Sequence, residues 1–106
     1  MVSRGEVWLV NLDPTVGSEI RKSRPCVVIS PPELSEHLKT VIVAPMTSQG
    51  FQAPFRISLT FQGTTGLVLL DQLRTIDKSR LIKKLGRIQP KTLTTTLQKL
   101  QELFEV

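Results

Sequence analysis

The chain has very few of the residues that build disulfides, metal centres and histidine-based active sites. Its 106 residues include one cysteine, Cys26, and one histidine, His37. A lone cysteine forms no internal disulfide, which is typical of proteins from a reducing cytoplasm. One histidine provides neither a zinc-ligand pair nor a two-histidine acid–base pair for RNA cleavage. The sequence therefore predicts no metal and no other cofactor, so hydrolysis would depend on arginine, threonine and carboxylate side chains.

Long apolar runs and phosphate-binding loops are also missing. No stretch approaches the roughly 20 apolar residues that cross a bilayer, and charged or polar residues interrupt Met1–Gly5, where a signal peptide would be apolar. There is no Gly-rich nucleotide loop and no Gly-x-Ser-x-Gly motif. We expect a cytoplasmic protein with no membrane segment and a single domain over residues 1–106. Because a core of this size is shallow, oligomerisation would help to bury more apolar surface.

Positive charge is concentrated in one segment. The net charge is +5, but residues 72–91 hold seven basic side chains and one acidic one, so this segment carries +6 and the rest of the chain −1. Two interpretations are open. A basic segment is often a solvated face of the fold. It can also bind an anionic polymer, with an affinity that falls as the salt concentration rises.

Apolar periodicity predicts short strands followed by one helix. Strands are expected at residues 6–13, 26–30, 40–44, 54–59, 66–71 and 80–88, the last interrupted by Gly86. Residues 14–24 read as a loop, 33–37 as one helical turn and 62–65 as a turn. Leu93, Leu97, Leu100 and Phe104 mark one face of a helix that begins near Pro90. This order indicates a small, strongly bent antiparallel sheet or barrel with a helix laid over it.

Two residues near the start of the chain are expected to be structural. Cys26 lies in a run of valine and isoleucine and is interpreted as a small buried core residue. Trp8, in the first strand, is expected in the core or at a dimer interface rather than as a platform for RNA bases.

Five short segments occur in the order in which a known toxin family has them. They are Arg4-Gly5-Glu6-Val7-Trp8; Asp13-Pro14-Thr15 with Gly17-Ser18-Glu19; Arg24-Pro25 with Val27-Val28; Pro45-Met46-Thr47-Ser48; and Gly66 to Asp71-Gln72 with Arg74-Thr75-Ile76. Each segment alone is weak evidence, but the ordered set resembles the MazF/PemK toxins of type II toxin–antitoxin systems. The fifth segment is similar to the Kid/PemK branch. The resemblance implies a mainly β fold with helices, a small SH3-like antiparallel β-barrel closed by the C-terminal helix.

The resemblance also implies an activity and partners. Toxins of this family cleave single-stranded RNA, usually mRNA at a short sequence, without a metal. The 2′-hydroxyl attacks the adjacent phosphate and leaves 2′,3′-cyclic phosphate and 5′-hydroxyl ends, which inhibits translation and growth. The expected partners are single-stranded RNA, a second copy in a homodimer, and a cognate antitoxin whose acidic tail covers the RNA site.

Arg24 and Thr47 match the family's catalytic arginine and threonine. A guanidinium is planar and positively charged and grips two phosphate oxygens, which suits stabilisation of the transition state. A threonine hydroxyl positions a phosphate oxygen. Taken singly, Arg24 would be a solvated charge and Thr47 a turn residue; the ordered matches favour catalysis. Glu19 is the candidate for assisting proton transfer or orienting Arg24, and Asp71 is either a base or a structural carboxylate.

Two positions depart from the Kid pattern. Ser18 stands where that branch has a histidine, and Leu69 stands where it has an arginine, so a site built on Asp71 is incomplete and the Arg24–Thr47 pair is preferred. Polar side chains that reach unstacked bases or phosphates recognise single-stranded RNA. The candidates for such contacts are Ser18, Ser48, Gln49, Gln72, Arg74, Lys78 and Arg80.

Two other functions stay open. The gyrase-poisoning toxin CcdB resembles this fold but depends on a tryptophan near its terminus, whereas this sequence reads Leu103-Phe104-Glu105-Val106. A non-catalytic SH3-like module could bind nucleic acid through residues 74–91. Substitution of Arg24 distinguishes these alternatives from a ribonuclease, because only a ribonuclease would lose RNA cleavage.

Overall fold

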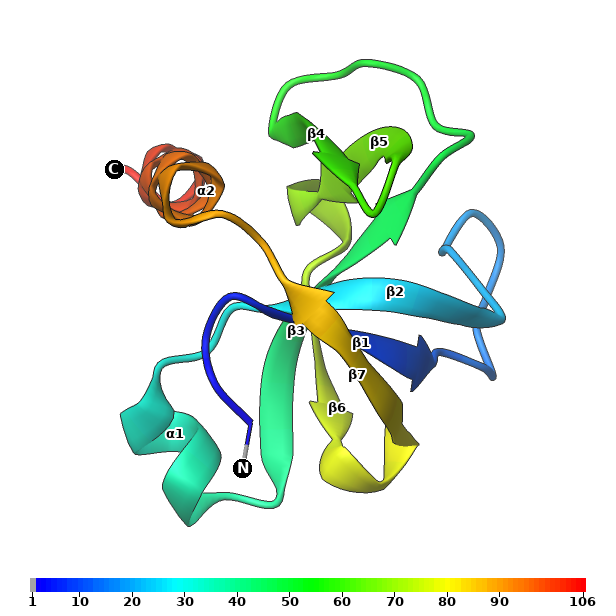
Figure 1. Ribbon diagram of the computed structural model, residues 1–106, viewed down its shortest axis with the longest axis vertical. Helices are drawn as coiled ribbons and strands as arrows, with labels where there is room; N and C mark the ends of the chain where they lie inside the picture. The colour runs from blue at the N-terminus through cyan, green and yellow to red at the C-terminus, as the bar shows by residue number, and fades with distance from the viewer. Residues whose placement is uncertain (1) are drawn as a thin grey trace.

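Seven antiparallel strands form one curled sheet in the computed structural model, which describes residues 2–106 (Figure 1). The strands are β1 (Glu6–Asn11), β2 (Ser23–Val28), β3 (Thr40–Thr47), β4 (Arg56–Phe61), β5 (Thr64–Leu69), β6 (Arg74–Asp77) and β7 (Leu81–Arg87). The helices are α1 (Pro32–His37) and α2 (Pro90–Leu103), and 3-10 turns at Leu70–Gln72 and Lys78–Arg80 flank β6. The order across the sheet is β4-β5-β3-β2-β1-β7, and β6 pairs with β3.

The curl of the sheet comes from a change of partner along β3. The first half of β3, Thr40–Val43, pairs with β6, whereas Met46 and Thr47 at its end pair with Val68 and Leu67 of β5. The other edge of β3 pairs with β2. Since β5 and β6 share one edge of β3 in succession, the sheet folds over and forms a half-barrel. This confirms the predicted mainly β, barrel-like fold with a C-terminal helix.

The central strands are buried on both faces. Val27 of β2 belongs to a cluster with Val7, Ala44 and other apolar residues, whereas its neighbour Cys26 belongs to a second cluster with Val43. Successive side chains of a strand point to opposite faces of the sheet, so the two clusters lie on the two sides of β2 and β3. Double-sided burial explains the continuous β-branched runs and confirms Cys26 as a core residue.

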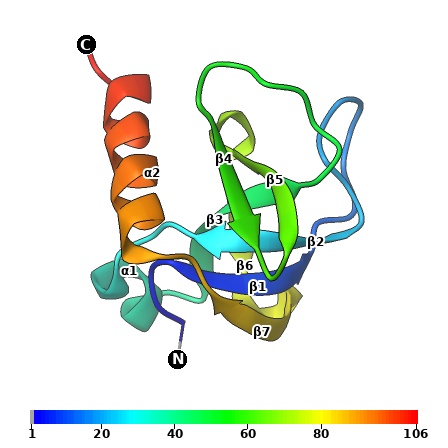
Figure 2. The same ribbon diagram turned by 45° about the horizontal axis from the view of Figure 1, so that its top comes forward.

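Helix α2 covers the first cluster. Leu93, Leu97 and Leu103 pack against it, and Leu100 belongs to it. The expectation that Phe104 completes this face was wrong: the helix ends at Leu103, and Phe104 is 69% exposed. Figure 2 shows α2 on one side of the sheet and the β1–β2 loop on the other. Neither α1 nor α2 is long and apolar enough to cross a membrane.

Several boundaries differ from the sequence expectation. β2 begins at Ser23 and β3 runs to Thr47, so Arg24 and Thr47 both belong to strands rather than to loops. The strand β6 was not predicted. The predicted turn at 62–65 connects β4 and β5, although Thr64 and Thr65 already belong to β5. The longer β2 and β3 matter for the site, because they bring their ends side by side.

Candidate functional site

A pocket of about 250 Å³ opens where β2 and β3 separate. Strands β2 and β3 supply one part of its lining, and β4, β5, β7 and the β4–β5 turn supply the rest. The lining residues are Arg24, Pro25, Met46, Thr47, Ser48, Phe61, Gln62, Thr64, Gly66 and Leu85. The pocket thus contains the two preferred catalytic candidates, Arg24 and Thr47, together with Ser48.

The register of β2 and β3 explains why Arg24 and Thr47 meet. Cys26 pairs with Pro45, and the same antiparallel register continued by two residues sets Arg24 opposite Thr47. Just after β2, Ile29 N donates a hydrogen bond to Ile42 O of β3. In an antiparallel pair every second residue donates to the same neighbour, so the backbone N–H of residue 25 would donate to β3. Pro25 has no N–H group. The ladder therefore ends, and the strands part with Arg24 and Thr47 on the two sides of the opening.

The polar groups of this pair remain largely available. The Arg24 Nε donates to Arg21 O over 3.1 Å, and its two terminal nitrogens bond to nothing within residues 2–106. The Thr47 Oγ1 accepts from Gln49 N over 3.2 Å, which leaves the hydroxyl hydrogen free to donate. Thr47 therefore lines the pocket from the end of β3, and its side chain also bonds to the segment that follows this strand. A guanidinium edge and a hydroxyl donor across one opening form an arrangement that suits a phosphate.

Two local features shape the rest of the pocket. β5 passes so close to the end of β3 that a Cβ at Gly66 would lie 2.6 Å from Thr47 O, so any larger residue would push the two strands apart. The β1–β7 register shifts between Val7 and Trp8, and Leu85 is the extra residue of this bulge. The Leu85 carbonyl accepts from Gln62 Nε2 over 2.7 Å, which joins the β4–β5 turn to β7.

The remaining catalytic candidates lie in a second depression. Glu19, Asp71, Gln72 and Arg74 line a depression of about 340 Å³ that shares no residue with the Arg24–Thr47 pocket. Asp71 binds the Arg56 guanidinium through both oxygens, at 3.0 and 2.9 Å. The hydrogen bonds from Arg56 hold the pKa of Asp71 below its ordinary value. A carboxylate held in this way is a weak base, which favours the structural interpretation of Asp71.

The whole chain was compared with known proteins. The family model described as "PemK-like, MazF-like toxin of type II toxin-antitoxin system" matches residues 3–104. The chain belongs to the PemK/MazF toxin family. It is 39% identical to Endoribonuclease PemK of Escherichia coli over 109 aligned residues, which cover 97% of this chain and 82% of PemK.

Solved structures of the family have the same fold. MazF from Deinococcus radiodurans superposes with a TM-score of 0.86 at 28% identity, over 99% of this chain and 97% of that one. A MazE–MazF complex from the same organism matches with a TM-score of 0.79 at 25% identity, over 99% and 96% of the two chains. These matches confirm the family and the fold that the five sequence segments predicted.

Most of the basic RNA-binding candidates are bound to the protein itself in this PemK/MazF chain. The Arg74 Nη1 donates to Leu12 O over 3.1 Å, the Arg80 Nη1 donates to Asn11 O over 3.1 Å, and the Lys78 Nζ donates to Ser35 O. The Gln72 Oε1 likewise accepts from Ile20 N over 2.6 Å. These side chains order the β1–β2 loop and α1.

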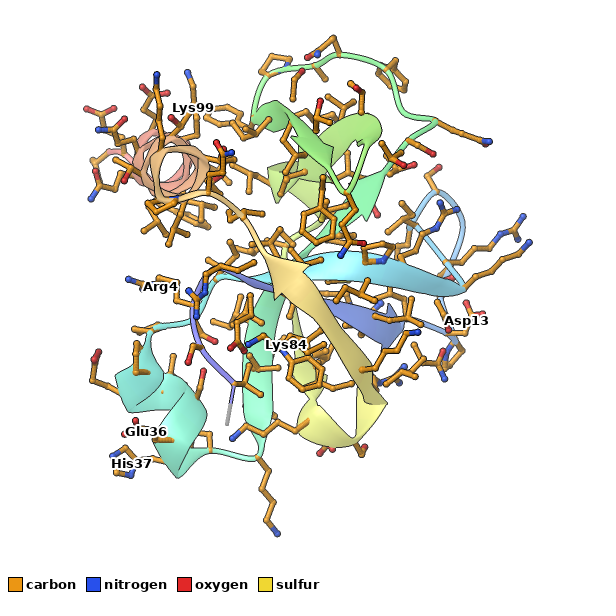
Figure 3. All side chains as sticks on the ribbon, viewed as in Figure 1. Arg4, Asp13, Glu36, His37, Lys84 and Lys99 are labelled. Carbon is orange, nitrogen blue, oxygen red and sulfur yellow. The ribbon has the colours of Figure 1, made fainter. Side chains whose placement is uncertain are left out.

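The basic segment is also divided in space. Arg80 additionally donates to Asp13 O, whereas Lys78 bonds to α1. Figure 3 places Asp13 on one side of the sheet and Glu36 of α1 on the other. Lys84 and Arg87 pair with Glu6. Together with Arg74, Lys78 and Arg80, five of the seven basic side chains of residues 72–91 therefore bind other parts of the protein. This placement favours a structural role over a continuous track for a polymer.

Sequence reasoning missed Glu6, a buried carboxylate at the start of β1. Its Oε1 accepts from Ser3 N over 2.8 Å and from Trp8 Nε1 over 3.1 Å, and its Oε2 lies 3.0 Å from Lys84 Nζ. Burial alone would raise the pKa of Glu6, but the bonds from Ser3, Trp8 and Lys84 together hold this pKa below its ordinary value. An acidic residue directly before the apolar run Val7-Trp8-Leu9-Val10 was the available signal. Trp8 is anchored here and packs against the second cluster.

Two exposed candidates lie outside both depressions. Ser18 is in the β1–β2 loop, and Gln49 follows Ser48 after β3; neither side chain lines the pocket or the second depression. The sequence analysis did not single out Arg56, because the role of this residue is to bind Asp71, which lies 15 residues away in the chain.

Proposed function

We propose that the protein is a metal-independent endoribonuclease toxin that cleaves single-stranded RNA, mRNA included, at a short sequence and thereby inhibits translation and growth. The observation that carries the proposal is the pocket that holds Arg24 opposite Thr47 in a chain of the PemK/MazF family. The name of the Escherichia coli relative, Endoribonuclease PemK, supports the choice of reaction.

The proposed reaction is the one that the family resemblance implies, and the pocket offers groups that suit it. The 2′-oxygen of one nucleotide bonds to the adjacent phosphorus, and the bond from phosphorus to the 5′-oxygen breaks. The products are a 2′,3′-cyclic phosphate and a 5′-hydroxyl. The terminal nitrogens of Arg24 bind the non-bridging oxygens, where negative charge grows in the transition state. The Thr47 hydroxyl donates to a phosphate oxygen and keeps the phosphorus aligned for attack.

Proton transfer needs a further group, because the 2′-hydroxyl loses its proton to a base and the leaving 5′-oxygen takes up a proton from the protonated base or from water. Glu19 is our candidate for accepting the 2′-hydroxyl proton or orienting Arg24. Its Oε1 accepts from Val16 N over 2.8 Å, and it lines the second depression, so it reaches the pocket only if the β1–β2 loop moves when RNA binds. Asp71, paired with Arg56, is the alternative base.

The proposed partners follow from the same pocket. Ser48 contacts the bound nucleotide, and Gln49 and Ser18 are exposed on the flanking loops for further RNA contacts. Gln72, Arg74 and Arg80 support the β1–β2 loop and its approach, and Lys78 supports α1, rather than reading bases. We further propose a homodimer that works in the cytoplasm and is inhibited by an acidic antitoxin; the MazE–MazF complex of a relative supports a protein partner of this kind.

The test is cleavage of a long natural RNA in EDTA, with the new 5′ ends mapped. We expect cuts at a recurring short motif with 5′-hydroxyl ends. Arg24→Ala should lower the rate roughly 10²- to 10³-fold without loss of folding, because it removes charge stabilisation of the transition state. Arg21→Ala is the matched control, since that side chain is exposed and only its carbonyl is used.

Other outcomes lead elsewhere. RNA that is bound but stays intact, with binding that survives Arg24→Ala, would establish the non-catalytic module. Intact RNA with altered DNA supercoiling would establish a gyrase poison. A loss of cleavage in Asp71→Ala as large as in Arg24→Ala, with folding intact, would move the catalytic centre to the second depression.

A further inference from the structure

The loop between β3 and β4 presents an exposed aromatic ring. Phe51 is 73% exposed, so most of its ring is in contact with solvent. The ring rests on the guanidinium of Arg56, whose Cζ lies 4.7 Å from the ring centroid. The loop therefore holds the ring against a planar support and leaves most of it open to solvent.

Arg56 is firmly fixed beneath the ring. Its Nη1 donates to Phe51 O over 3.1 Å, and its Nε and Nη2 bind the two oxygens of Asp71. The Arg56 side chain is only 12% exposed. With its charge paired and its donors in use, Arg56 is poorly placed to bind a phosphate itself. Its contribution is to position the loop and the ring.

The ring stands beside the proposed active site. The residues on either side of it, Gly50 and Gln52, line a furrow of about 210 Å³. Thr47, Ser48 and Gly66 line both this furrow and the Arg24–Thr47 pocket, so the two hollows adjoin at these residues. Figures 1 and 2 show this loop on the same side of the molecule as the β1–β2 loop. A strand of RNA that left the pocket along the furrow would pass Gly50 and Gln52, the two neighbours of Phe51 in the chain.

We propose that Phe51 is a stacking platform for an unpaired base of the RNA substrate, next to the nucleotide held at Arg24 and Thr47. Arg56 and Asp71 act as positioning residues for this ring. Aromatic side chains and arginine planes are the groups on which single-stranded bases stack. The inference rests on the proposed ribonuclease activity and adds to it a residue that determines how the substrate binds.

The experiment measures steady-state cleavage of a short RNA that contains the mapped site. Stacking of one base on an aromatic ring has a known range of strength, so Phe51→Ala should raise KM roughly 5- to 100-fold with little change in kcat. Phe51→Trp should keep a low KM, and its fluorescence should change on addition of RNA; Trp8 is the only tryptophan of the natural sequence. Phe51→Leu should behave like Phe51→Ala, because leucine is apolar but lacks a π face.

An abasic substrate gives an independent reading. Removing the base next to the scissile site should raise KM for the natural protein but not further for Phe51→Ala, because both changes delete the same contact. Phe104→Ala is the matched control: Phe104 is also exposed, at the end of α2, and its loss should leave KM unchanged.

The outcomes separate the two proposals. If the natural protein cleaves no RNA, the proposed function fails and the stacking role fails with it. If it cleaves RNA and Phe51→Ala has an unchanged KM, the stacking role alone is overturned. An unchanged KM combined with weakened self-association or antitoxin binding would assign the ring to a protein interface instead, and a low KM in Phe51→Leu would refute base stacking.

Discussion

Gly66→Ala probes whether the position of Thr47 limits the reaction. The added Cβ would lie 2.6 Å from Thr47 O and 3.2 Å from Thr47 C, both backbone atoms. Ordinary contact begins at 3.4 Å, so β5 and the end of β3 have to separate by about 0.8 Å. Because Met46 and Thr47 form the β3–β5 pairing, this displacement falls directly on Thr47.

The expected magnitudes follow from that displacement. Overpacking costs about 1–3 kcal/mol of unfolding free energy. Alanine also lowers the conformational entropy of the unfolded chain, which offsets about 0.4–1 kcal/mol of this loss. The net loss is therefore about 1 kcal/mol, and most of the protein stays folded. A misplacement approaching 1 Å at a catalytic group lowers the rate up to about 10²-fold. We expect kcat to fall far more than the folded fraction.

Gly5→Ala is the matched control. It also adds one methyl group, at a φ of +91°, where an L side chain is strained, and its nearest contact is the Leu93 side chain at 3.1 Å. It should cost about 1–2 kcal/mol but leave Thr47 in place. Cleavage rates and thermal unfolding of both variants give the comparison. If Gly66→Ala cleaves RNA as fast as Gly5→Ala at equal folded fraction, the geometric argument for Thr47 is refuted.

Glu6 and Cys26 give two further predictions. Glu6→Gln should lower the unfolding free energy at pH 7 by about 1.5–3 kcal/mol. The glutamine keeps one oxygen that accepts from Ser3 N and Trp8 Nε1, but it loses the negative charge that strengthens these bonds and pairs with Lys84. Folding lowers the pKa of Glu6, so the stabilisation by this carboxylate is complete above its unfolded pKa and disappears as the pH falls through its folded pKa. The melting temperatures of the variant and the natural protein should therefore converge in acid. A difference that stays constant with pH would contradict this. Burial raises the pKa of the Cys26 thiol to about 12, so iodoacetamide at pH 8 should label it only after denaturation; rapid labelling of the folded protein would show that Cys26 is accessible.

Local sequence patterns predicted most of the fold. The β-branched runs around Val27 and Val43 indicated strands, and the leucine spacing from Leu93 indicated the closing helix, because such patterns reflect which residues are buried. The strand β6 was missed, since Arg74–Asp77 has no alternating pattern and is ordered by pairing with β3. Phe104 was misplaced because periodicity does not show where a helix ends.

Local sequence patterns likewise predicted one part of the candidate site and missed another. The motif segments singled out Arg24 and Thr47, and their register in β2 and β3 brings them to one pocket. No local pattern predicted that Asp71 would be bound by Arg56 from a neighbouring strand. The contiguous basic segment looked like one surface, yet its side chains reach different parts of the fold.

The sequence by itself determined the types of most elements and the toxin family, and it singled out the arginine–threonine pair as a candidate, because each depends on residues that are adjacent or periodic along the chain. Only the tertiary structure decided which polar side chains are committed to the fold. Gln72, Arg74 and Arg80 bond to backbone groups 52, 62 and 69 residues away. A contact across that separation arises only when the curled sheet brings β1, β6 and β7 together, so the position of a charge in the sequence did not show whether it faces RNA or the protein itself.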